Sequence, residues 1–231
     1  DGGGGGPVCN SQPYTVFVSP KGSANIDGVP YADEDVVQYD AGNCEWSSVF
    51  DGTAAGLPAS ANVAALAVDG TDLYLSFLAK LNVPGLGQIS DSDVVKWNGS
   101  TFSLFFDGSN YGLSVAAEDV DAIAFDTNGD LLISTSGAYT APNLPKGQDE
   151  DLLRVDGSAL EVYFDGGNNA GLGAEDIVGA DVAANGDIYL SVLDAFNLGG
   201  TKGTAADIFR CVSSGLGYQN TACTYNLFWD S

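Results

Sequence analysis

Histidine and methionine are both absent from the 231 residues of the chain. Without histidine, the chain lacks the commonest general base and transition-metal ligand, and it cannot build a Ser-His-Asp or Cys-His catalytic site. No nucleophile-elbow, phosphate-binding or dinucleotide-binding glycine motif is present either. We therefore expect no enzyme activity, and a glycoside hydrolase that uses a pair of carboxylates remains the catalytic alternative.

Basic residues are scarce: Lys and Arg total 7 against 31 Asp and Glu, which gives a formal charge of −24. A field of this sign repels nucleic acid and anionic membranes and attracts cations. No apolar run approaches the roughly 20 residues that a membrane-spanning helix needs. We expect neither nucleic-acid binding nor membrane insertion, while 45% hydrophobic residues are enough to form a core.

The lack of methionine and the start at Asp1, followed by a glycine run, predict a processed and exported chain. The four cysteines, Cys9, Cys44, Cys211 and Cys223, form no CxxC pair, so a zinc site is not indicated. An even number of cysteines in an exported chain favours two disulfides and an extracellular or cell-surface location. Buried free thiols in a cytosolic protein are the alternative.

Internal repeats organise the rest of the chain. An acidic cluster followed by two apolar residues recurs at residues 33–37, 91–95, 149–153 and, more weakly, 205–209, in steps of 58, 58 and 56 residues. An aromatic-Asp-Gly segment recurs at residues 50–52, 106–108 and 164–166 and drifts to Trp229-Asp230-Ser231 in the last copy. The chain is therefore built from four copies of a unit of about 57 residues.

Each unit holds four short strands. In the third unit these are residues 120–125, 131–134, 152–155 and 160–164, with a type I′ hairpin expected at Asn128-Gly129. Four antiparallel strands per repeat predict an all-β, four-bladed β-propeller with blades at about 7–51, 62–107, 119–165 and 176–230. Residues 14–231 then form one domain, and only the Gly-rich segment 1–13 can supply the first strand of blade one. A β-sandwich is the alternative fold.

The pattern Val120-Asp121-Ala122, an Asn-Gly turn, an apolar second strand and an aromatic fourth strand resembles the four-bladed hemopexin-type propeller. The units are also similar to repeats of large secreted bacterial proteins that carry DED, FDG and EDVDA segments. The first resemblance implies the architecture, and the second implies secretion without a defined activity.

Because antiparallel strands alternate in direction, the acidic segments should all lie on one face, which we call the acidic face. Carboxylates gathered in this way repel one another unless a cation intervenes, and calcium takes six to eight oxygen ligands. The predicted calcium ligands are Asp33, Asp35, Asp91, Asp93, Glu118, Asp119, Asp149, Asp151, Glu175, Asp176 and Asp207. Further acids expected on this face are Glu34, Asp51, Asp107, Asp121, Glu150, Asp165 and Asp230. The alternative is that these acids cap loops and keep the surface soluble. We interpret the residues 126–130 as a hairpin turn and not as a calcium loop.

The same strand order predicts the disulfides Cys211–Cys223, across a hairpin of the last blade, and Cys9–Cys44, at one end of the first. We expect an extracellular structural protein that self-associates, with segment 1–13 at a subunit boundary where a weak β-edge invites another chain. A calcium-dependent, lectin-like propeller that binds glycans is the alternative, and a hydrolase follows it.

Overall fold

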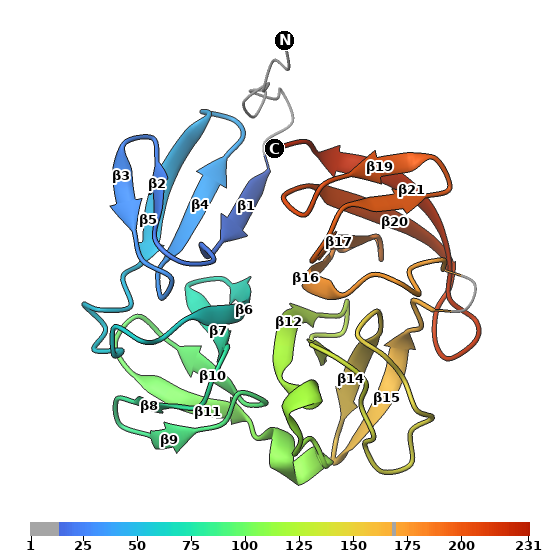
Figure 1. Cartoon of the computed structure of the whole chain (residues 1–231), viewed down its shortest axis with the longest axis horizontal. Helices are drawn as coiled ribbons and strands as arrows, with labels where there is room; N and C mark the ends of the chain where they lie inside the picture. Colours follow the sequence, from blue (N-terminus) through green and yellow to red (C-terminus); the bar gives the residue numbers. More distant parts are fainter. Residues whose placement is uncertain (1–13, 168–169) are drawn as a thin grey trace.

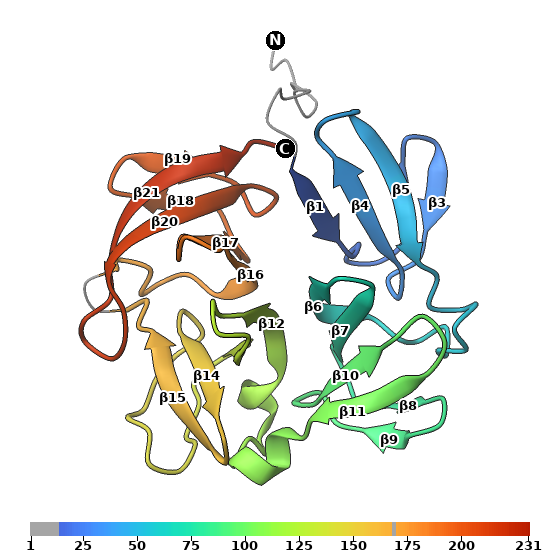
Figure 2. The same cartoon turned by 180° about the vertical axis from the view of Figure 1, so that it is seen from behind.

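The computed structural model describes residues 14–167 and 170–231 as four antiparallel sheets arranged around a common axis. Figure 1 shows the four sheets as the blades of a propeller, and Figure 2 shows the same arrangement from behind. The predicted all-β, four-bladed propeller is confirmed. Among the described residues, no helix is long and apolar enough to cross a membrane.

Three blades contain four strands each, counted outward from the axis. Blade two consists of β6 (Val63–Asp69), β7 (Asp72–Phe77), β10 (Val94–Trp97) and β11 (Phe102–Phe106). Blade three consists of β12 (Val120–Phe125), β13 (Leu131–Thr135), β14 (Leu152–Asp156) and β15 (Ala159–Phe164). Blade four consists of β16 (Ile177–Val182), β17 (Ile188–Val192), β20 (Ile208–Gly215) and β21 (Ala222–Trp229). The strands predicted for the third unit agree with these bounds to within one residue.

Blade one has three strands within the described part of the chain: β1 (Thr15–Val18), β4 (Val36–Asp40) and β5 (Glu45–Phe50). β1 pairs with β4 as β7 pairs with β10, so β1 occupies the second position of the repeat. The predicted first strand of this blade falls within residues 1–13, which lie outside the described residues.

The second and third strands of three blades are joined through a small hairpin. These hairpins are β2 (Ala24–Ile26) with β3 (Val29–Tyr31), β8 (Leu81–Val83) with β9 (Gly87–Ile89), and β18 (Phe196–Leu198) with β19 (Thr201–Gly203). In blade three the corresponding connection, residues 136–151, contains no described strand. Two short 3-10 helices, η1 (Gly108–Tyr111) and η2 (Ala116–Glu118), link blade two to blade three.

Apolar side chains form four clusters, each between two neighbouring blades. The aromatic residues that end the outer strands belong to these clusters, and Phe106, Phe164 and Trp229 are all buried. Blade four packs against blade one through Trp229, Tyr39 and Tyr14, so the ring is closed by aromatic contacts. Truncating one such buried aromatic residue to alanine costs about 3–5 kcal/mol.

The hairpin at Asn128-Gly129 is not the predicted type I′ turn. Such a turn needs a positive φ at both central residues, and within this turn only Gly129 has one, at 85°. The Gly129 N–H donates to the Asp126 carbonyl, and the Asp126 N–H donates to the Asp130 carbonyl. The connection is therefore a type I turn followed by a left-handed glycine. The Asp126 side chain accepts from the backbone N–H groups of Asn128 and Asp130, which agrees with a hairpin turn over residues 126–130.

Candidate functional site

The last acid of each acidic cluster binds backbone N–H groups. One carboxylate oxygen accepts from the residue three positions earlier, as Asp93 does from the Ser90 N–H at 2.7 Å. The other oxygen accepts from the second residue after the outer strand, as Asp93 does from the Gly108 N–H at 3.1 Å. The four acids with this pair of bonds are Asp35, Asp93, Asp151 and Asp207. These two bonds tie the turn before the third strand to the end of the outer strand. This structural role explains why the acid recurs in every blade and requires no metal ion.

The glycine of the aromatic-Asp-Gly segment is explained by the same contact. A Cβ atom on Gly108 would lie 2.5 Å from the Ser92 carbonyl oxygen, and one on Gly166 would lie 2.1 Å from the Glu150 carbonyl oxygen. Gly52 faces Glu34 in the same way. The backbone after each of these three outer strands therefore lies against the middle residue of the acidic cluster, where no side chain fits.

Glu118, predicted as a calcium ligand, has both carboxylate oxygens occupied by hydrogen bonds. Oε2 accepts from the backbone N–H groups of Ser114 and Val115, and Oε1 accepts from the N–H and hydroxyl of Thr140. Burial alone would raise the pKa of Glu118, but these hydrogen bonds lower it below the ordinary value. Glu118 therefore fastens two loops together and stays ionised.

The first acid of each cluster lies at the junction with the next blade. Its backbone carbonyl accepts from the N–H that begins the next inner strand: Asp33 from Val63, Asp91 from Val120, and Asp149 from Ile177, at 2.8–3.0 Å. These three contacts join blade one to two, two to three and three to four. They confirm that the acidic clusters and the starts of the inner strands meet on one face.

The side chains above these junctions differ. At the first junction, the Asn62 amide donates to the Asp33 carboxylate at 3.0 Å. At the second junction, the position of Asn62 is taken by Asp119, whose carboxyl group lies within hydrogen-bonding distance of that of Asp91. Burial and the charge of Asp91 raise the pKa of Asp119 to about 6. An amide can donate a proton to a carboxylate, whereas two ionised carboxylates repel each other.

The third junction gathers more acid than the other two. Asp176 holds the position of Asn62, and its carboxyl group lies within hydrogen-bonding distance of that of Asp121 on β12. Asp149 contributes a third negative charge to both groups. Burial, followed by the charge of its acidic neighbours, raises the pKa of Asp121, and burial also raises that of Asp176.

Asp121 and Asp176 each keep one oxygen atom unsatisfied. The Oδ1 atoms of both residues are buried and have no hydrogen-bond partner among residues 14–167 and 170–231. Asp121 is only 8% exposed, and it occupies a β-bulge between Val120 and Ala122. An unpaired carboxylate at such a site is costly, because desolvation is not compensated.

Most of the predicted calcium ligands therefore fall into two groups. The acids that accept backbone N–H groups serve the fold, whereas Asp91 with Asp119, and Asp149 with Asp176, bring carboxylates from two blades together. Glu175 lies beside Asp194, and burial with the charge of Asp194 raises its pKa. Within the described part of the chain, no three acidic groups converge into a ready-made metal site. From the sequence, Asp121 was expected on the acidic face but not as a calcium ligand. A signal was visible, because the equivalent positions of blades two and four hold the apolar residues Ala64 and Val178.

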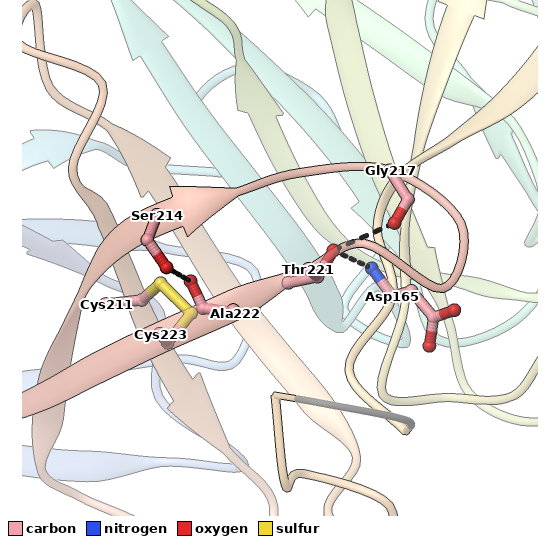
Figure 3. The surroundings of a disulfide bond; sticks show 7 residues. All are labelled: Asp165, Cys211, Ser214, Gly217, Thr221, Ala222 and Cys223. Carbon is pink, nitrogen blue, oxygen red and sulfur yellow. Dashed lines mark hydrogen bonds between the residues drawn. A yellow bond between two sulfur atoms is a disulfide. The ribbon is translucent and has the colours of Figure 1, made fainter.

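A disulfide braces the long outer hairpin of blade four. Cys211 on β20 is bonded to Cys223 on β21, as predicted, with 5.2 Å between their Cα atoms. Figure 3 shows that the tip of this hairpin reaches blade three, where the Asp165 N–H donates to the Thr221 hydroxyl at 2.8 Å. Cys44 is not a free thiol, and its predicted partner Cys9 lies outside the described residues.

Searches of protein families and of curated proteins find no match for this chain. Among solved structures, a presumed gluconolactonase is similar over 90% of this chain and 74% of its own, with 13% identity and a TM-score of 0.39. Virginiamycin B lyase from Staphylococcus aureus is similar over 94% and 74%, with 8% identity and a TM-score of 0.38. YCF48 bound to D1 peptide is similar over 96% and 88%, with 9% identity and a TM-score of 0.33. Similarity at this level carries no information on activity, and the sheet topology itself defines the chain as a four-bladed β-propeller.

Proposed function

We propose that this chain is an extracellular structural protein: a calcium-stabilised propeller that self-associates into a surface fibre or matrix. The observation that carries the proposal is the inner position of blade one, which no strand fills among residues 14–167 and 170–231. In blades two, three and four, the second strand is covered by β6, β12 and β16. β1 holds the second position of blade one, and within residues 14–167 and 170–231 no strand pairs with its axial edge. An uncovered strand edge is a template for a strand from another chain.

The predicted Cys9–Cys44 disulfide argues against residue 9 as the occupant of this position. Cys44 lies in the hairpin that joins β4 to β5, so it lies at the outer side of the blade. The inner-strand position is about two to three strand spacings away, roughly 12 Å, whereas bonded cysteines need Cα atoms within about 7 Å. If Cys9 is bonded to Cys44, residue 9 cannot also sit in the inner-strand position.

The proposed occupant is the N-terminal segment, residues 1–13, of a neighbouring copy. Gly2 to Gly6 carry no side chains, so they can add backbone hydrogen bonds in a crowded place near the axis. A contact in which one copy donates a segment and the next receives it is head-to-tail, and it produces a filament when the ring does not close. With a formal charge of −24 per copy, assembly also needs cations to reduce repulsion between subunits.

An extracellular location is consistent with the Cys211–Cys223 disulfide, because such bonds persist in oxidising compartments. The similarity of the repeats to those of secreted bacterial proteins points the same way. No particular contact among the described residues favours a lectin or a hydrolase over a structural role.

The test is deletion of residues 1–6, followed by electron microscopy and analytical sedimentation of the protein in calcium. We expect the intact protein to form filaments or large assemblies and the deletion variant to remain monomeric. A matched pair refines the test: Gly4→Pro removes a backbone N–H and should impair assembly, whereas Gly4→Ala keeps the N–H and should not.

A strictly monomeric intact protein, or unaltered assembly after the deletion, would overturn the self-association. An unchanged melting midpoint in calcium and in chelator would overturn the calcium part by itself. Calcium-dependent binding of the monomer to a glycan array would favour the lectin alternative.

A further inference from the structure

Asp121 lies on β12, the inner strand of blade three, and Asp176 directly precedes β16, the inner strand of blade four. β12 and β16 run next to each other at the axis (Figures 1 and 2). The two carboxyl groups are close enough for a hydrogen bond, which they can form only while one of them is protonated. The Oδ1 atom of each is buried without a partner in the described structure, although buried polar atoms are almost always satisfied.

The repeat itself shows that these acids are not needed for the fold. The bulge position of Asp121 is held by Ala64 in blade two and by Val178 in blade four, and the backbone register is the same in all three. The position of Asp176 is held by Asn62 in blade two, where the side chain is satisfied. A fold that forms with alanine and asparagine at these places carries two extra carboxylates at one junction, the buried Asp121 and the half-buried Asp176.

We propose that Asp121 and Asp176, next to Asp149, bind a calcium ion between blades three and four on the acidic face, with water completing the shell of ligands. This inference rests on the calcium-stabilised part of the proposed function and locates it. Bound calcium would supply each orphaned Oδ1 atom with a partner and offset the repulsion among the three charges.

The chemistry of the donors selects the metal class. Both proposed ligands are carboxylates, and the chain has no histidine and no free cysteine among the described residues, so soft or imidazole-preferring metals lack their ligands. Calcium accepts six to eight oxygens in flexible geometry, and water can complete a shell that protein groups only begin. Magnesium requires nearly ideal octahedral geometry, which two side chains from separate blades are poorly placed to give.

The other junctions act as internal controls. The first junction offers one carboxylate, Asp33, and its amide partner neutralises the contact. The second offers two, Asp91 and Asp119, and the bulge residue there is Ala64. The third is alone among the described junctions in adding a buried carboxylate, Asp121, to such a pair, so it should bind calcium most tightly.

The test uses the full chain, stripped with chelator and titrated with calcium chloride by calorimetry. Asp121→Ala and Asp176→Asn each install the residue that the repeat already carries, so both variants should fold. We expect wild type to bind calcium and each variant to lose at least about tenfold in affinity for the tightest site. Asp156→Asn changes an exposed acid in the β14–β15 hairpin and should keep wild-type affinity.

Melting in chelator gives a second readout. Both variants should melt at or above wild type without calcium, and their midpoints should rise less when calcium is added. Wild-type calcium affinity in both variants would overturn the site while leaving calcium stabilisation elsewhere intact. No binding by wild type would overturn the site together with the calcium part of the proposed function, and an equal loss in Asp156→Asn would show general charge screening instead. Self-association is measured separately and does not depend on any of these results.

Discussion

The first and third blade junctions share a backbone contact and differ in the side chains above it. In both, the carbonyl of an Asp accepts from the N–H that opens the next inner strand, with Asp33 at one junction and Asp149 at the other. Asn62 completes the first contact with a hydrogen bond, whereas Asp176 brings a further negative charge to the third. The backbone contact therefore belongs to the repeat, and the charge above it can vary without changing the fold.

The largest effect on this comparison should come from the disulfide, which supports only the third junction. In Cys211→Ser/Cys223→Ser, the β20–β21 hairpin loses its brace, and its contact with Asp165 weakens. We expect the free energy of unfolding to fall by about 3 kcal/mol, the usual value for a loop of this length. Denaturant titration measures the loss, and a change below about 1 kcal/mol would contradict the role given to the hairpin.

Replacing the glycine of the aromatic-Asp-Gly segment with alanine tests a close backbone contact that blades one and three share. Gly52→Ala and Gly166→Ala each place a Cβ atom within 2.6 Å of a backbone carbonyl oxygen. We expect a loss of about 2 kcal/mol in each variant, because backbone cannot move aside as a side chain can. Gly129→Ala serves as a control, since its Cβ would meet nothing within 4 Å and only its φ of 85° is strained. A larger loss at Gly129 than at Gly52 would contradict the importance of the close approach.

Asn62→Asp makes the first junction resemble the third. The amide that donates to Asp33 is replaced by a carboxylate that cannot donate, so a hydrogen bond is lost and two like charges face each other. We expect a destabilisation of about 1.5 kcal/mol in chelator, measured by denaturant titration. Asn62→Ser keeps a donor and should cost less. Equal stability of Asn62→Asp and wild type would show that the charge above the junction is immaterial.

Asp176→Asn makes the reverse change and should have the smallest effect. In chelator, an amide next to Asp121 and Asp149 can donate where a carboxylate repels, so stability should increase by about 1 kcal/mol. Thermal melting with and without calcium checks the sign. Destabilisation in chelator would indicate that Asp176 is satisfied in some other way.

Repetition made the fold predictable. The acidic cluster and the aromatic-Asp-Gly segment mark the start of the third strand and the end of the fourth, so strand order, blade number and the Cys211–Cys223 pair all followed from their spacing. The turn at Asn128-Gly129 was predicted wrongly, because an Asn-Gly pair is compatible with more than one hairpin geometry. Here the Asp126 side chain holds the backbone in the longer form through two N–H bonds.

By itself, the sequence determined which residues recur and therefore that four similar blades form, with their acids on one face. Only the tertiary structure decided what each acid does there. Asp93 and Glu118 look like metal ligands in the sequence, yet their oxygens are occupied by N–H and hydroxyl donors. Asp121 looks like one acid among many, yet it is buried against Asp176 with an oxygen that no described group satisfies. The reason is that hydrogen-bond donors reach these carboxylates from loops and from neighbouring blades, and repeat spacing carries no information on which donor arrives at which oxygen.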